Sequence, residues 1–207
     1  MKTTTCKIFS DASYDNLTGK CGYGVAIVMD GLTIFKYGSI RGAKSCCEAE
    51  VLAAKKGLDY LKTKEFKRLC RPVKKVVLLS DNYCVKAFNP GSQATERWRR
   101  RLKKSTHRLA DIIDSMRESV KGLERGSVAL HINGHAKPEN AGKTEKQKMD
   151  YKYNNWCDQS ARKNLRYGLK GKMIIKCTGI TGPEKYVVEV PVGAKISWQQ
   201  NNLARNL

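Results

Sequence analysis

Four acidic residues stand where their carboxylates could meet at one site: Asp11, Glu48, Asp81 and Asp158. Asp11 and Asp81 each follow an apolar stretch typical of a β-strand, which delivers the next side chain to one edge of a sheet. Glu48 and Asp158 lie in patterns typical of helices. Four clustered carboxylates repel one another unless cations lie between them, and Mg²⁺ prefers oxygen ligands. The pattern therefore predicts a metal-dependent site that acts on phosphates.

The composition indicates a polyanionic partner. Forty Lys and Arg residues against nineteen Asp and Glu give a formal net charge of +21, which is typical of proteins that bind nucleic acid. A merely basic, soluble protein is the alternative. A hydrophobic share of 41% and a charged share of 29% exclude a disordered chain. The length of 207 residues suffices for one buried core.

Eight cysteines do not indicate disulfides or zinc here, because paired C-x-x-C spacing is absent and no apolar run of signal-peptide length precedes the first strand. Four of them fall in apolar patterns and are expected to be small buried residues: Cys6, Cys21, Cys84 and Cys157. No apolar stretch is long enough to span a membrane. We therefore expect a cytoplasmic monomer in a reducing compartment.

Local patterns predict the order three antiparallel strands, helix, strand, helices, strand, helix. The strands are expected at 5–10, 25–29, 32–37, 76–80 and 127–132, and the helices at 45–64, 82–88, 93–123 and 154–165. The polar stretch 137–152 is expected to form a loop. After Gly168, further strands are expected at 173–175, 186–190 and 194–198.

Glu48 has a structural alternative. Ser45 is suited to cap the helix that follows it, and Glu48 stands at the third helical position, as in a capping box. The same glutamate is therefore a candidate metal ligand and a candidate capping residue.

Five motifs in this order resemble those of type 1 ribonucleases H, over roughly residues 4–167. They are Phe9-Ser10-Asp11-Ala12-Ser13, Glu48-Ala49-Glu50-Val51-Leu52-Ala53-Ala54, Leu79-Ser80-Asp81-Asn82, Gly134-His135-Ala136-Lys137-Pro138-Glu139-Asn140, and Asn154 followed by Asp158 and Ala161-Arg162. The resemblance implies a ribonuclease H-like α/β fold. Its five-stranded mixed sheet, an antiparallel meander and then parallel strands, would be flanked by helices. Residues 1–167 would form the catalytic domain and residues 168–207 a small β-rich extension.

The resemblance also implies an activity. The chain would hydrolyse the RNA strand of RNA–DNA hybrids with two Mg²⁺ ions, Mn²⁺ being an alternative, and leave 5′-phosphate and 3′-hydroxyl ends. Asp11 would bridge the ions, Glu48 and Asp81 would complete one site, and Asp158 would complete the other. His135 would assist proton movement or product release, its alternative being a surface histidine without a role.

The second functional feature is a basic stretch that resembles the hybrid-binding protrusion of some family members. Its candidate contacts are Arg97, Trp98, Arg99, Arg100, Arg101, Lys103 and Lys104. Lys and Arg would meet phosphates, and Trp98 would lie against a sugar or base. The alternative is a solvated helix face. Further candidate nucleic-acid contacts are Ser13, Ser45, Asn82 and Asn154.

Two departures from the family pattern affect substrate recognition. An insertion at 141–153 separates His135 from Asp158, and Ser45-Cys46-Cys47 precedes Glu48 where family members often place Asn and Arg. Two other functions stay open at this point. One is another nuclease of the same superfamily, such as a DNA junction resolvase, and the other is a non-catalytic nucleic-acid-binding module.

Overall fold

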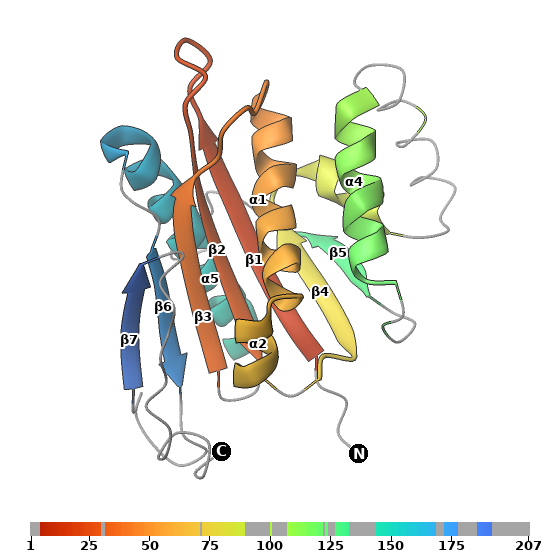
Figure 1. Ribbon diagram of the computed structural model, residues 1–207, viewed down its shortest axis with the longest axis vertical. Coiled ribbons are helices and arrows are strands. Elements are labelled where there is room, and N and C mark those ends of the chain that lie inside the picture. The colour runs from red at the N-terminus through yellow and green to blue at the C-terminus, as the bar shows by residue number, and fades with distance from the viewer. Residues whose placement is uncertain are drawn as a thin grey trace.

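A single seven-stranded sheet organises the chain in the computed structural model (Figure 1). The structure describes residues 5–29, 32–70, 72–89, 100, 107–121, 123, 127–132, 144–168, 172–177 and 186–191. Across the sheet the strands follow the order β5-β4-β1-β2-β3-β6-β7. Their bounds are β1 Thr5–Tyr14, β2 Cys21–Met29, β3 Leu32–Ser39, β4 Lys75–Ser80, β5 Val128–His131, β6 Lys172–Cys177 and β7 Tyr186–Pro191.

The first five strands confirm the predicted mixed sheet. β1, β2 and β3 pair antiparallel as a meander, whereas β4 is parallel to β1 and β5 is parallel to β4. The helices and the 3₁₀ helix η1 are α1 Cys46–Leu61, α2 Lys64–Leu69, η1 Tyr83–Phe88, α4 His107–Ser119 and α5 Glu145–Tyr167. Helices α1 and α4 cover one face of the sheet and α5 covers the other (Figure 1). This is the ribonuclease H-like arrangement that the sequence predicts.

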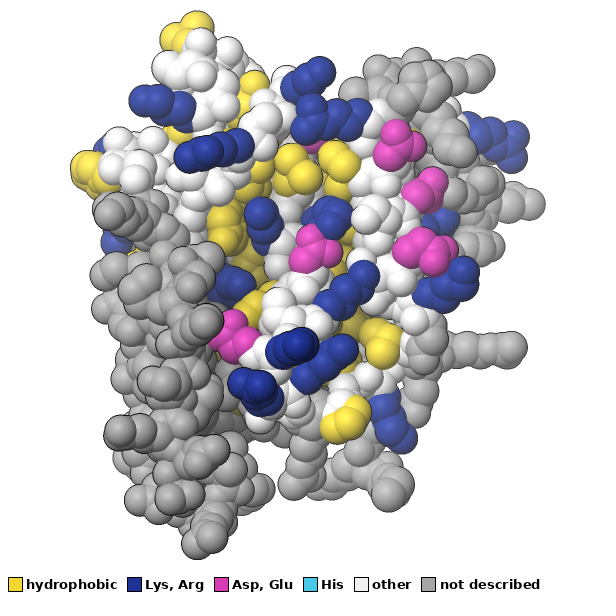
Figure 2. Space-filling model, viewed as in Figure 1, with side chains coloured by type: hydrophobic (Ala, Val, Ile, Leu, Met, Phe, Trp, Pro, Cys, Tyr) yellow, Lys and Arg dark blue, Asp and Glu magenta, His cyan; other side chains and the backbone are white. Residues whose placement is uncertain are grey.

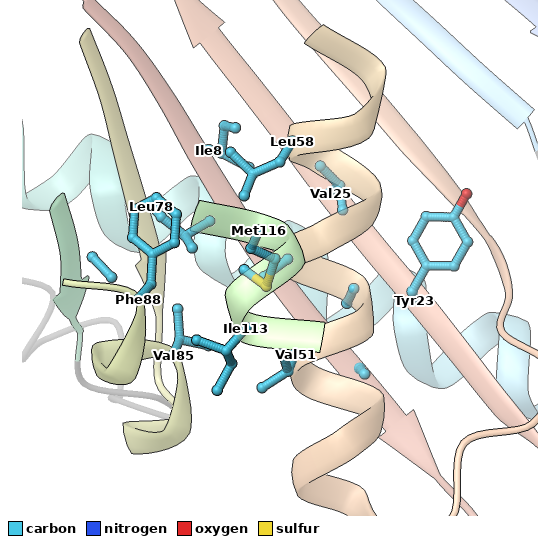
Figure 3. Close-up of a cluster of buried hydrophobic side chains, with 14 of the residues drawn as sticks. Ile8, Tyr23, Val25, Val51, Leu58, Leu78, Val85, Phe88, Ile113 and Met116 are labelled. Atoms are coloured by element: carbon cyan, nitrogen blue, oxygen red, sulfur yellow. The ribbon is translucent and has the colours of Figure 1, made fainter. Parts of the chain in front are cut away.

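The main core lies between the sheet and helices α1 and α4. In Figure 3, Ile8, Val25 and Leu78 from the strands meet side chains of the helices, with Leu58 of α1 and Met116 of α4 among them. All five of these side chains are almost fully buried. Burial of each contributes roughly 1.5–3 kcal/mol, so this layer fixes α1 firmly against β1 and β2.

Helix α5 approaches the other face unusually closely. A Cβ atom added to Gly24 of β2 would lie 2.4 Å from the carbonyl oxygen of Cys157, and one added to Gly22 would lie 2.2 Å from that of Ala161. The two glycines therefore let the helix backbone rest directly on β2. This contact fixes the height at which Asp158 is held beside the sheet.

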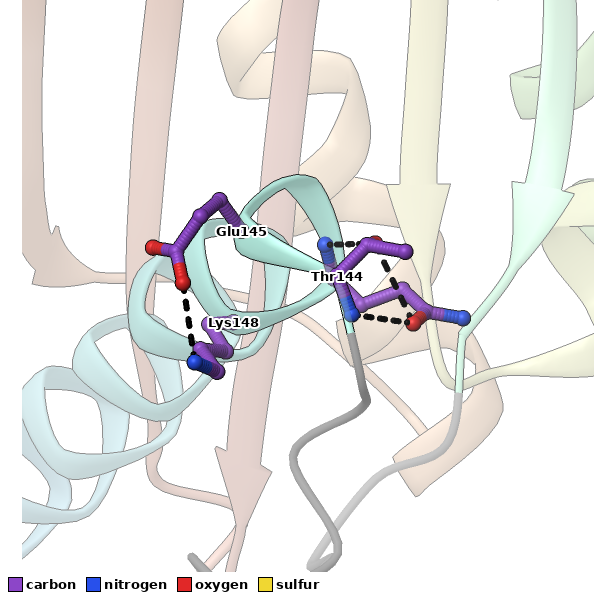
Figure 4. A network of polar contacts seen from close by, with 4 residues as sticks. Thr144, Glu145 and Lys148 are labelled. Atoms are coloured by element: carbon purple, nitrogen blue, oxygen red, sulfur yellow. Dashed lines mark hydrogen bonds and ion pairs between the residues drawn. The ribbon is translucent and has the colours of Figure 1, made fainter.

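The first part of α5 corrects one expectation. Residues 145–152 belong to the stretch predicted as a loop, yet they form the opening turns of α5. Thr144 and Gln147 form a reciprocal capping box: Gln147 N–H donates to Thr144 Oγ1 (3.2 Å) and Thr144 N–H donates to Gln147 Oε1 (3.1 Å) (Figure 4). The Lys148 ammonium also pairs with Glu145 at 2.8 Å. Strong helix formers and a good cap outweigh the missing apolar period.

The two strands after Gly168 continue the main sheet. β6 pairs antiparallel with β3, and β7 pairs antiparallel with β6. The third strand expected at 194–198 lies outside the described residues, as does most of the helical pattern before α4. Among the described helices, none is long and apolar enough to cross a membrane.

Candidate metal centre

Strand register brings two of the four predicted acids together. Phe9 of β1 is the parallel partner of Leu79 of β4. Asp11 and Asp81 each lie two residues farther along, so they reach the same level on neighbouring strands. Asp11 is almost fully buried and Asp81 is half-buried.

A third carboxylate, from α1, completes the cluster. Among the described residues, ligand oxygens of Asp11, Glu50 and Asp81 all lie within 4.8 Å of one another. Glu50 is 6% exposed, and its Oε2 accepts a hydrogen bond from the Ala12 N–H at 3.1 Å. That bond joins α1 to β1 beside Asp11. We call Asp11, Glu50 and Asp81 the acidic cluster.

Glu50 occupies the place for which the sequence analysis chose Glu48. The two residues are about 200° apart around the helix, at ~100° per residue, so their side chains cannot face the same neighbour. Glu48 is turned away from the cluster, and its Oε1 lies 2.9 Å from Nε of Arg108 on α4. This buried oxygen accepts no hydrogen bond among the described residues, so its contact with Arg108 is an ion pair.

The predicted capping of α1 by Ser45 is confirmed, through the backbone N–H of Glu48. The Glu48 N–H donates to Ser45 Oγ at 3.2 Å, so Ser45 is the N-cap. Glu50 was missed although a signal for it existed. It stands four residues before Ala54 and seven before Gly57, small residues that mark the side of α1 lying against the sheet.

Asp158 lies near the acidic cluster but outside the set of oxygens within 4.8 Å. It is half-buried on α5, and its Oδ1 accepts a hydrogen bond from Arg162 Nε at 2.7 Å. After burial and the charge of Asp81, the negative charge of Asp158 is a smaller cause of the raised pKa of Asp11. The guanidinium holds Asp158 in one orientation beside the cluster.

The cluster is electrostatically strained without cations. Burial raises the pKa of Asp11 from 3.8 to about 7, and the charge of Asp81 adds to the rise. Burial, followed by the charges of Asp11 and Asp81, likewise raises the pKa of Glu50 well above its ordinary value. Hard divalent cations fit this set, because the donors are all carboxylate oxygens and a bound cation offsets their repulsion.

The other residues predicted to bind nucleic acid differ in how far they are exposed. Ser13 is half-buried, Ser45 is exposed, and Asn82 Oδ1 accepts a hydrogen bond from the Cys84 N–H at 2.8 Å. Asn154 is only 5% exposed, which leaves little of it accessible to a substrate. Of the basic stretch only Arg100 is described, and it is exposed. His135, Arg97, Trp98, Arg99, Arg101, Lys103 and Lys104 lie outside the described residues.

The face of the molecule that carries α1 and α4 is rich in positive charge. Figure 2 shows Lys and Arg side chains spread over the face formed by α1 and α4, with acidic side chains in smaller groups between them. A face rich in Lys and Arg favours the approach of a polyanion.

No protein-family model and no curated protein matches this chain. Similar solved structures include RNase H1 of the halophilic archaeon Halobacterium salinarum, with 12% sequence identity and a TM-score of 0.46 over 78% of this chain and 98% of that chain. The N-terminal RNase H domain of a Mycobacterium tuberculosis protein has 12% identity and a TM-score of 0.45 over the same shares. LC11-RNase H1, isolated from compost, in complex with an RNA/DNA hybrid has 15% identity and a TM-score of 0.42 over 77% of this chain and 99% of that chain.

Proposed function

We propose that this chain is a ribonuclease H, an endonuclease that hydrolyses the RNA strand of RNA–DNA hybrids and leaves 5′-phosphate and 3′-hydroxyl ends. The observation that carries the proposal is the acidic cluster, whose three carboxylates converge within 4.8 Å. Such a cluster at the carboxyl end of a strand, in a chain of net charge +21, suits a metal-dependent reaction on a phosphodiester.

Two Mg²⁺ ions, or Mn²⁺ in their place, are the proposed cofactors. Asp11, Glu50 and Asp81 would hold one ion, and Asp158 with Asp11 would hold the second. When bound, the ions would supply an activated water and relieve the charge that develops on the leaving oxygen.

The chain's own residues would position these ligands. The Ala12 N–H fixes one Glu50 oxygen at 3.1 Å, and Arg162 fixes one Asp158 oxygen at 2.7 Å. Ligands held in place before the substrate arrives need little reorganisation during the reaction. His135 is proposed to move a proton or assist product release, as the sequence resemblance implies.

The choice of RNA over DNA is proposed to depend on contacts with 2′-hydroxyl groups. Ser13 lies two residues beyond Asp11 on β1, and Ser45 lies at the start of α1, so both flank the acidic cluster. Because Ser45 Oγ already accepts from the Glu48 N–H, its hydroxyl hydrogen is the group left to donate to a substrate.

A cleavage panel tests the proposal. Labelled RNA–DNA hybrid, double-stranded RNA, double-stranded DNA and four-way DNA junctions are incubated with the protein and Mg²⁺, and separately with Mn²⁺. We expect cleavage of the RNA strand of the hybrid alone. Preferred cleavage of the junction would indicate a resolvase, and binding without cleavage of any substrate would indicate a non-catalytic module. Either result would overturn the proposal.

A further inference from the structure

A stacked pair of aromatic side chains beside Asp81 takes no part in the acidic cluster. Tyr83 begins η1 and stacks on His131, the last residue of β5, with 4.0 Å between ring centroids and 22° between ring planes. The Lys86 ammonium lies 4.5 Å from the centroid of the Tyr83 ring. Tyr83 is nevertheless 54% exposed. We call Tyr83, Lys86 and His131 the aromatic platform.

Strand pairing places this platform at the edge of the sheet that carries the acidic cluster. His131 is the parallel partner of Ser80, and the Ile132 N–H donates to the Ser80 carbonyl at 3.0 Å. Asp81 follows Ser80 directly, and Tyr83 follows two residues later. A phosphate held at Asp81 would therefore have its neighbouring nucleotides beside the platform.

The chemistry of the platform fits a nucleotide whose base is unpaired. Inside a duplex, each base is covered on both faces by its neighbours, so only an unpaired base can stack on an aromatic side chain. The ring of Tyr83 is already held by His131, so little conformational freedom of the ring is lost on binding. The Lys86 ammonium, which lies over the same ring, would leave it for a phosphate as the base stacks. Lys86 adds a positive charge for a phosphate, and the net charge of +21 favours a nucleic acid over other partners.

We propose that the aromatic platform binds an unpaired nucleotide of the substrate next to the cleavage site, with the base stacked on Tyr83 and a phosphate at Lys86. This inference rests on the proposed function for the position of the substrate. It adds that a hybrid flanked by a single strand binds more tightly than a blunt hybrid. The gain from one stacked base is roughly 5- to 150-fold in affinity.

Fluorescence anisotropy on two labelled hybrids tests this. One hybrid is blunt and the other carries a single-stranded tail, and Ca²⁺ replaces Mg²⁺ in both titrations. We expect Tyr83→Ala to weaken binding of the tailed hybrid by roughly 5- to 150-fold and to leave the blunt hybrid within about 2-fold. Tyr83→Phe, which keeps the ring, should bind both hybrids as the unaltered protein does.

Tyr167→Ala serves as the matched control. Tyr167, the last residue of α5, is also an exposed tyrosine beside a cation, Arg166. An equal loss for both hybrids in Tyr83→Ala, or no loss for either, would overturn the inference. Failure of the proposed function is seen separately, as absence of hybrid cleavage by the unaltered protein with Mg²⁺.

Discussion

At the scale of single residues, the central result is that Glu50 and not Glu48 joins Asp11 and Asp81. The sequence predicts Asp11 and Asp81 well, because each follows an apolar stretch typical of a strand. Asp81 does follow β4, whereas β1 continues to Tyr14 and Asp11 lies within it, at the level of Asp81.

The sequence also predicts a glutamate on the first helix, but two candidates stand two residues apart. The packing of α1 against β1, which turns Glu48 toward Arg108, decides between them. The sequence signal for this choice is the position of Glu50 on the same side of the helix as Ala54 and Gly57.

A matched pair of substitutions tests this assignment. Glu50→Gln should reduce hybrid cleavage by more than about 100-fold, because losing a ligand removes several kcal/mol of transition-state stabilisation. It should also reduce the rise in melting temperature that Mg²⁺ produces. Glu48→Gln should keep that rise and lower the free energy of unfolding by about 1–2 kcal/mol, since Arg108 is partly exposed. The reverse pattern would restore Glu48 as the ligand.

The raised pKa of Asp11 predicts how stability depends on pH without divalent cations. Between pH 3.8 and about 7 the folded state keeps a proton on Asp11 that the unfolded state has released. Raising the pH through this window therefore lowers stability. Thermal unfolding in EDTA should show this fall, and Mg²⁺ should stabilise the protein more above pH 7 than at pH 5. Asp11→Asn should flatten both trends, and an unchanged pH profile in that variant would contradict the account.

At the scale of elements, α5 shows where sequence patterns are insufficient. Residues 145–152 lack an apolar period, and one of their contacts with the sheet is polar, a 2.7 Å ion pair between Asp150 and Lys7. A hydrophobic period reports burial of apolar side chains, so it misses a helix anchored in this way. Thr144 and Gln147, three residues apart, were the available signal for its start.

The capping box provides a test at this scale. Thr144→Ala should lower the free energy of unfolding by about 0.5–2 kcal/mol and speed hydrogen exchange in residues 145–152. Lys148→Ala removes only an exposed ion pair and should cost less than about 0.5 kcal/mol. Urea denaturation and hydrogen-exchange mass spectrometry measure both effects. Equal, negligible effects would mean that the cap does not stabilise this helix.

At the scale of the whole molecule, local patterns predict the first five strands and also β6 and β7, and the family resemblance implies the mixed sheet. Local patterns could not predict that β6 would pair with the edge of β3, because the sequence of a strand does not determine which strand it pairs with. The extension therefore continues the main sheet on the side away from β5. The acidic cluster lies toward the other side, at β1 and β4.

Charge distribution gives a further prediction for the whole molecule. Replacing Arg99, Arg100 and Arg101 with Ala should weaken hybrid binding and reduce the slope of log affinity against log salt concentration by about 2–3. Filter binding over a range of salt concentrations measures this slope.

A second triple variant distinguishes loss of direct phosphate contacts from loss of net charge. Three exposed lysines lie at the C-terminal end of α1 and in α2: Lys62, Lys64 and Lys67. Their replacement with Ala removes the same charge. We expect a smaller change in slope from this control. Equal changes in both triple variants would remove the three arginines from the interface.

The proposed role of the acidic cluster is to cleave RNA in hybrids with divalent cations, and loss of one of its carboxylates is the sharpest test of that role. Cleavage of a labelled RNA–DNA hybrid is measured with Mg²⁺ for the unaltered protein and for Asp81→Asn. We expect cleavage by the unaltered protein and a loss of more than about 100-fold in Asp81→Asn, while hybrid binding survives. Full activity of Asp81→Asn in the presence of Mg²⁺ would contradict that role.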